Sequence, residues 1–200
     1  MERCNWQNLE NSEIYIEYHD NEWGVPSFND AHLFEMFILE SFHCGLSWLL
    51  ILKKRENFRK AFDHFNADII ANYDDGKISE LMLDEGIVRN KAKILATIQN
   101  AKSYLKVVEE FGSFSNYLWG FTDNKVVYHP FDGVTTRNEL SDKVSKDLKK
   151  RGFKFMGTVT CYSYLEAIGI MNNHAPNCFK YVTSPPDTSN LSVLFGHTYI

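Results

Sequence analysis

The chain has 200 residues, 44% of them hydrophobic, a size and composition that suit one globular domain with a sizeable core. Its longest apolar stretch, near residues 46–52, is far shorter than the roughly twenty residues of a membrane span, and its polar start lacks the apolar core of a signal peptide. The net charge of −5 disfavours nucleic acid as a partner, although basic clusters at 53–55, 89–93 and 146–154 weaken that objection.

Helical periodicity dominates the sequence, so the predicted fold class is mainly α. Apolar residues share one helix face over 29–43, and after a break at Gly45 the pattern continues into the 50s. Asn66 suits the N-cap of a short helix, and a longer helix is predicted over 89–111. A short apolar segment at 114–121 and an extended piece at 125–128 follow. Thr136 and Glu139 suit a capping box, and the last helices are predicted over 141–151 and 158–171.

Glu40 is unusual because it lies on the same predicted stripe as Leu33, Met36 and Phe37, which should face the core. A buried carboxylate destabilises a fold unless it is paired or hydrogen-bonded. From the position alone, a structural glutamate and an acceptor that lines a pocket are equally good interpretations.

Aromatic side chains surround Glu40 in the sequence, with Tyr15, Tyr18 and Trp23 before it and Trp48 after it. Such a group usually belongs to a hydrophobic core. Next to a buried carboxylate, however, it would form a receptacle for a flat, electron-poor or cationic ring. Aromatic faces attract cations, and a carboxylate accepts hydrogen bonds from ring amino groups.

Two metal-competent residues lie near each end of the chain. The four are Cys4, His19, His174 and Cys178. A Cys₂His₂ set is sufficient to hold zinc in a closed tetrahedron, and it would tie the two ends together. Spacing alone favours another interpretation, in which two buried cysteines and two surface histidines are unrelated. The four cysteines in total are too irregularly spaced for a secreted disulfide framework, so we expect a cytoplasmic protein with reduced thiols.

The segment 83–94 fits a helix-hairpin-helix, in which apolar residues and a turn at Gly86 precede a helix whose first turn carries Arg89 and Lys91. Backbone N–H groups at such a helix N-terminus can hold a DNA phosphate without reading the base sequence. The pattern is degenerate, so by itself it is weak support for DNA binding.

Several longer motifs are more specific. They are Met1-Glu-Arg-Cys4, Tyr18-His19-Asp-Asn-Glu-Trp23-Gly-Val-Pro26, Leu33-Phe-Glu-Met36, Leu39-Glu40, Gly45-Leu-Ser-Trp48, Leu52-Lys-Lys-Arg-Glu56, Leu148-Lys-Lys-Arg-Gly-Phe-Lys-Phe155 and His174. In these motifs, over about residues 1–178, the chain resembles bacterial 3-methyladenine DNA glycosylase I. The run Phe42-His43-Cys44 departs from the polar residues common in relatives, so the resemblance does not predict the details of the pocket next to it.

The resemblance implies a helix-hairpin-helix DNA glycosylase fold in which one structural zinc ion joins the N- and C-terminal segments. The implied zinc ligands are Cys4, His19, His174 and Cys178. The implied base-binding residues, with Glu40 also as the catalytic residue, are Tyr15, Tyr18, Trp23, Glu40 and Trp48. The expected DNA contacts are Gly45 and Leu46, which match a loop that approaches the gap left by an extruded nucleotide, together with Gly86, Arg89 and Lys91.

The activity implied by the resemblance is the hydrolytic release of 3-methyladenine from alkylated double-stranded DNA, with the free base and an abasic site as products. N3-methylation makes the base a cation and a good leaving group, so little acid catalysis is needed. We expect poor activity on neutral bases. The family lacks the aspartate that other helix-hairpin-helix glycosylases use, and Asp142 and Asp147 lie in the corresponding region without being assigned that role.

We expect a monomer with a single glycosylase domain over 1–179, whose zinc-binding part is built from 1–25 and 155–179. Residues 180–200 read as a loosely ordered tail, in which the apolar 193–195 could dock. A non-catalytic binder of alkylated DNA or of free methylated purines, with the same fold, remains an alternative. A zinc-dependent hydrolase would need an open coordination position, and four protein ligands leave none.

Overall fold

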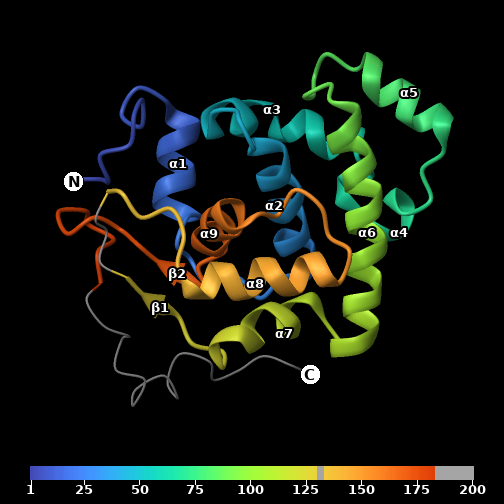
Figure 1. Cartoon of the computed structure of the whole chain (residues 1–200). Helices are drawn as coiled ribbons and strands as arrows, with labels where there is room; N and C mark the ends of the chain where they lie inside the picture. Colours follow the sequence, from blue (N-terminus) through green and yellow to red (C-terminus); the bar gives the residue numbers. More distant parts are fainter. Residues whose placement is uncertain (130–132, 183–200) are drawn as a thin grey trace, which may run out of the picture.

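The structure, a computed structural model, describes residues 1–129 and 133–182. These residues form nine α-helices, two 3₁₀ turns and one parallel pair of short strands, so the predicted mainly α class is confirmed (Figure 1). The helices are α1 (Glu13–Asn21), α2 (Asp30–His43), α3 (Trp48–Ala61), α4 (Ala67–Ile70), α5 (Asp75–Leu83), α6 (Lys91–Phe111), α7 (Phe114–Trp119), α8 (Glu139–Lys150) and α9 (Thr158–Ala167). The strands are β1 (Val127–Tyr128) and β2 (Met171–Asn172), and the 3₁₀ turns are Asp63–Phe65 and Gly120–Thr122.

Helix α2 is the centre of the fold and packs against α3, α6, α7 and α9 (Figure 1). From Leu33 to Phe42, every residue except Glu35 is buried, so the helix is enclosed on all sides. The predicted stripe is therefore present but wider than expected. Glu40 is among these buried residues, which means that its carboxylate needs partners inside the protein.

The predicted helix-hairpin-helix is formed by α5, the turn at 84–90 and α6. Asp84 Oδ1 accepts a hydrogen bond from the Gly86 N–H at 2.7 Å, and Lys54 Nζ donates to the Glu85 and Gly86 carbonyls at 2.8 and 3.1 Å. A Cβ at position 86 would lie only 2.9 Å from Asp84 Oδ1 and 3.1 Å from Asn57, so the close approach requires glycine.

Side-chain caps begin most of the helices. The prediction for Asn66 is confirmed, because its side chain accepts the Ile69 N–H at the start of α4. The predicted capping box from Thr136 to Glu139 is wrong. Asn138 is the N-cap of α8 and forms the box with Ser141, so Glu139 is the first helical residue and is not in the third position that a capping box needs.

The predicted helix ends shift by a few residues. Helix α6 begins at Lys91 because Asn90 caps it. Helix α9 ends at Ala167 and not near Met171. Gly169 follows with a φ of +73°, and a Cβ there would lie 2.2 Å from the Val25 backbone. The chain can pass this point only by leaving the helix, after which Met171 pairs in parallel with β1. Helix α1 was not predicted.

The two ends of the described chain lie side by side. The Phe179 N–H donates to the Glu2 carbonyl at 2.9 Å, and the segment after β2 runs back to the N-terminal segment (Figure 1). Within residues 1–129 and 133–182, no helix has both the length and the apolarity to cross a bilayer. Most of the predicted tail, 183–200, including 193–195, and the predicted turn at 130–132 lie outside the described residues.

Candidate active site and metal centre

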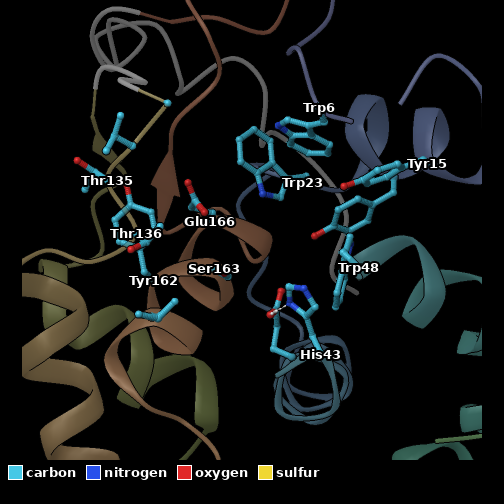
Figure 2. Close-up of a pocket in the computed structure, with 15 residues that line it drawn as sticks. Trp6, Tyr15, Trp23, His43, Trp48, Thr135, Thr136, Tyr162, Ser163 and Glu166 are labelled. Atoms are coloured by element: carbon cyan, nitrogen blue, oxygen red, sulfur yellow. Dashed lines mark hydrogen bonds and ion pairs between the residues drawn. The ribbon is translucent and has the colours of Figure 1, made fainter. Parts of the chain in front are cut away.

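A cavity of about 320 Å³ opens between α1, α2, α9 and the segment before α8 (Figure 2). Its size is at the lower end of the usual range for a small-molecule site. The lining residues are Trp6, Tyr15, Tyr18, Trp23, Glu40, His43, Trp48, Gly133, Val134, Thr135, Thr136, Val159, Tyr162, Ser163 and Glu166. All five residues predicted to bind the base, Tyr15, Tyr18, Trp23, Glu40 and Trp48, therefore line one cavity.

Glu40 presents a carboxylate to this cavity from the last turn of α2 and is only 3% exposed. Burial raises the pKa of this carboxyl, and the hydrogen bond with His43 Nδ1, 3.2 Å from Oε2, acts in the opposite direction. Glu40 is thus partnered without being closed off, since the cavity lies beside it. This arrangement supports the pocket interpretation over the purely structural one.

Aromatic rings form one side of the cavity. Tyr18 and Trp48 lie with ring centroids 5.4 Å apart, and the His43 ring meets Trp48 edge-on at 5.3 Å. Burial is the main reason that the pKa values of Tyr15 and Tyr18 are raised, so both phenols are neutral in the physiological range. Trp48 Nε1 is buried and has no hydrogen-bond partner in the part of the chain that the structure describes. The aromatic side of the cavity is therefore largely apolar and suits a flat ring.

Several lining residues were not found from the sequence. His43 lies one helical turn after Glu40, and this i,i+3 spacing on a predicted helix is the signal that could have found it. Trp6 joins from the N-terminal segment, with its ring 5.3 Å from Tyr15. Tyr162 and Glu166 come from α9. Local patterns cannot reveal these last three residues, because long-range packing brings them to the cavity.

The loop at Gly45 and Leu46 lies next to the hairpin. Gly45 has a φ of +80°, and Leu46 is 37% exposed. Lys93, in the first turn of α6, is buried, and its Nζ donates to the Phe42 and Cys44 carbonyls at 2.8 and 2.7 Å. One lysine thus holds the loop against the second helix of the hairpin.

The other predicted DNA contacts lie on or near the hairpin turn. Gly86 is in the turn itself, where it makes the close contacts described above. Arg89 is exposed and lies 3.6 Å from Glu85. Lys91 is exposed and begins α6. The hairpin therefore presents two basic side chains at the N-terminus of a long helix.

The four predicted metal ligands form one buried cluster, with all four ligand atoms within 4.8 Å of one another. Cys4 Sγ and Cys178 Sγ each lie 3.5 Å from His174 Nδ1, and Cys178 Sγ lies 3.6 Å from His19 Nε2. Burial lowers the pKa of both histidines, to about 4 for His174, so each imidazole is neutral and has a lone pair for a metal. The donor set fits one metal ion.

Residues around the cluster orient the ligands. His19 Nδ1 lies 2.7 Å from Asp20 Oδ1, and Arg3 binds the same carboxylate through Nε and Nη2 at 2.8–3.0 Å. This carboxylate partner directs His19 Nε2 toward the cluster, as in many metal sites. The Trp23 backbone partly offsets the lowering of the His174 pKa.

The metal cluster and the cavity share two tryptophans. Trp6 meets His19 edge-on at 4.9 Å, and Trp23 meets His174 edge-on at 4.6 Å. The two indoles meet each other at 4.6 Å, and both line the cavity. Displacement of either histidine would therefore move a wall of the pocket.

The Asp142 and Asp147 side chains do not line the cavity at Glu40. Asp147 accepts hydrogen bonds from Tyr117 Oη at 2.8 Å and from Arg151 Nε at 2.6 Å, and Asp142 accepts from Thr158. Both carboxylates are used within the fold, so the structure gives neither a place beside a bound base.

Comparisons with known proteins agree with this arrangement. The Methyladenine glycosylase family matches residues 6–181. DNA-3-methyladenine glycosylase 1 of Escherichia coli (strain K12) is 41% identical over 189 residues, which cover 93% of this chain and 100% of the relative.

Solved structures extend the likeness to the fold. A crystal structure of 3-methyladenine DNA glycosylase I is 41% identical with a TM-score of 0.85, and the match covers 89% of this chain and 98% of the other. A variant of 3-methyladenine DNA glycosylase I in complex with 3-methyladenine is 37% identical with a TM-score of 0.82, and covers 84% and 92%. The helix-hairpin-helix, the cavity at Glu40 and the buried Cys₂His₂ cluster together define a DNA glycosylase. The chain belongs to the methyladenine glycosylase family.

Proposed function

We propose that this glycosylase receives an extruded 3-methyladenine in the cavity at Glu40 and releases it from alkylated DNA in base excision repair. It is an N-glycosylase, so hydrolysis leaves an abasic site and the free base. The proposal rests on a buried carboxylate that faces an aromatic-walled cavity in a close relative of a 3-methyladenine DNA glycosylase.

Recognition follows from the charge and shape of the damaged base. In DNA, 3-methyladenine carries a positive charge, and Glu40 supplies a buried negative charge with which to attract it. Glu40 would also accept a hydrogen bond from the 6-amino group. Tyr15, Tyr18, Trp23 and Trp48 would enclose the flat ring, and the face of an aromatic ring attracts a desolvated cation by up to about 2 kcal/mol. A neutral purine gains less from the same pocket.

Bond cleavage needs little from the protein once the base has been extruded. Extrusion of a base costs a few kcal/mol of stacking and pairing, and a damaged base costs the least. The methylated base departs as a neutral molecule because its positive charge is lost when the bond to the sugar breaks. Glu40, the proposed catalytic residue, holds the base in the orientation for departure, and water then completes the hydrolysis at the sugar.

Two neighbouring elements of the protein are proposed to contact the DNA. The hairpin, with Gly86, Arg89 and Lys91, would hold the phosphate backbone through its basic side chains and the helix N-terminus. Leu46, which is exposed beside Gly45, would approach the gap that the extruded nucleotide leaves. Lys93 holds this loop against the hairpin through its two hydrogen bonds. This supports a fixed distance between the phosphate-binding hairpin and the base-binding cavity.

We propose zinc as the metal of the Cys₂His₂ cluster, with a structural role. Tetrahedral zinc with bonds of about 2.3 Å to sulfur and about 2.05 Å to nitrogen places sulfur and nitrogen roughly 3.6 Å apart. The sulfur–nitrogen distances of 3.5–3.6 Å in the cluster match this geometry. Four protein ligands leave no position for water, so the ion would stabilise the fold rather than take part in the chemistry.

The proposed organisation is one monomeric domain over 1–179, whose metal-binding part is built from 1–25 and 155–179. The contacts between the two ends support it, because Phe179 hydrogen-bonds to Glu2 and Ala175 N–H donates to Cys4 Sγ at 3.3 Å.

Single-turnover release of free base from alkylated duplex DNA, with no added cofactor, tests the proposed function. We expect 3-methyladenine to appear at a rate at least a hundredfold above that of hypoxanthine from a matched duplex. Equal rates for the two bases would contradict recognition by charge. Binding of alkylated DNA without release of any base would instead identify a non-catalytic binder with the same fold.

A further inference from the structure

A second carboxyl group lines the base cavity. Glu166, in the last turn of α9, faces the space from one side, while Tyr15 and Trp48 face it from the other (Figure 2). Glu40 also lines this cavity, where its Oε2 lies 3.2 Å from His43 Nδ1. Two carboxylates in one small cavity repel each other, so the two carboxyl groups are expected to differ in protonation.

The hydrogen bonds around Glu166 distinguish its two oxygens. Asn173 Nδ2 donates to Glu166 Oε1 at 2.8 Å and to Tyr162 Oη at 2.8 Å. Among the described residues, Oε2 accepts no hydrogen bond. Oε1 is therefore fixed as an acceptor by an amide, and Oε2 is the oxygen available to a ligand. A protonated carboxyl group with this arrangement carries its hydrogen on Oε2.

The groups that face Glu166 favour its neutral form. Among residues 1–129 and 133–182, the other titratable side chains that line the cavity are Glu40 and His43 on α2, Tyr15 and Tyr18 on α1, and Tyr162 on α9. None of these described lining residues is a lysine or arginine, and the hydrogen bond of His43 goes to Glu40. Burial, aided by the charge of Glu40 and opposed by the Asn173 hydrogen bond, raises the pKa of Glu166 to about 8. At neutral pH Glu166 is thus mainly protonated.

We propose that Glu166 is a specificity-determining residue, whose neutral carboxyl group donates a hydrogen bond from Oε2 to a ring nitrogen of the bound purine. Glu40 accepts from the 6-amino group, and the acceptor nitrogens N1 and N7 lie on either side of that group in adenine. A cavity that offers an acceptor from one carboxyl group and a donor from another can match this edge. A 6-oxopurine, which presents an acceptor at position 6, meets the carboxylate of Glu40 and is rejected. This inference rests on the proposed function of the cavity.

The variants Glu166→Gln and Glu166→Ala distinguish two possible roles of this side chain, that of a hydrogen-bond donor and that of a charged carboxylate. The glutamine amide can still accept from Asn173 through its oxygen and donate through its nitrogen, at any pH. We expect Glu166→Gln to bind free 3-methyladenine within about threefold of the native protein at pH 7, and Glu166→Ala to bind about tenfold more weakly. Between pH 7 and 9.5, the native protein should lose about tenfold in affinity, whereas Glu166→Gln should follow only the titration of the ligand.

Calorimetric titration with free 3-methyladenine at both pH values is the measurement. Val159→Ala, on the same wall of the cavity and 51% exposed, is the matched control and should keep the pH dependence of the native protein. Thermal melting at pH 7 shows whether each variant is folded.

A Glu166→Gln variant that binds as weakly as Glu166→Ala at pH 7 overturns the inference, because the charge would then be what binds. Equal affinities for all the proteins, with no difference in pH dependence, overturn it too, since Glu166 would only be part of the wall. Failure of the proposed function looks different: the native protein itself would neither bind the free base nor release it from DNA.

Discussion

Removal of the metal from the Cys₂His₂ cluster should destabilise the protein on the scale of its whole stability. Cys4 and His174 are 170 positions apart in the chain, so an ion bound to both would close almost the entire domain into one loop. A cross-link of that span restricts the unfolded chain by about 5 kcal/mol at 25 °C. Native domains are stable by only about 5–15 kcal/mol in total.

Chelation should therefore lower Tm by about 10–20 °C, because about 1 kcal/mol moves Tm by 2–4 °C in chains of this size. Scanning calorimetry before and after chelation, with elemental analysis of the ion released, is the assay. Cys178→Ala should have a lower Tm than the native protein, and the chelator should no longer change that Tm. Cys161→Ala, a buried cysteine outside the cluster, should still respond. A protein that gives up one zinc ion and yet melts within about 3 °C of the untreated sample would refute the loop-closure reasoning.

Three further substitutions and one pH series test other parts of the structure. Glu40→Gln removes a charge-assisted contact of about 1.5–3 kcal/mol, so single-turnover excision should fall roughly 10- to 150-fold, and full activity would exclude the proposed role. Lys93→Met, which leaves two backbone carbonyls near the end of α2 without their donor, should slow excision from duplex DNA more than it weakens binding of the free base; equal effects would argue against a positioning role. Gly169→Ala should reduce the free energy of unfolding by roughly 3 kcal/mol or more in urea titrations, because the new Cβ would lie 2.2 Å from the Val25 backbone at a positive φ; an unchanged midpoint would contradict this contact. The pKa of Glu166 is raised from 4.5 to about 8 in the fold, so its protonated form stabilises the fold fully below pH 4.5 and this contribution is lost as the pH rises to about 8. Urea titrations from pH 5 to 8 should therefore show Glu166→Gln gaining stability relative to the native protein, by at most about 1.4 kcal/mol per pH unit, and parallel curves would disprove the shift.

Local sequence was a good guide to the buried stripe of α2 and to the N-cap of α4. The stripe on α2 placed Glu40 among buried residues, and it is 3% exposed. Asn66 was recognised as a cap because its residue type and the apolar residues after it are sufficient. The capping box failed, since two overlapping patterns were available. The structure selects Asn138 and Ser141, and the Ser141 hydroxyl also lies 3.1 Å from Thr158 Oγ1 of α9, a contact between helices that the local pattern does not contain.

The assembly of the cavity was decided by packing between distant segments. The sequence by itself determined the helical class, the buried acid at position 40 and, through resemblance, the four ligands. Only the tertiary structure brings Trp6 and Glu166 to the same cavity, because helix α9 packs on α2 and the metal cluster holds the N-terminal segment beside them. Periodicity and capping depend on neighbours within one or two helical turns, whereas the position of a carboxyl group across a cavity depends on contacts between segments more than a hundred residues apart.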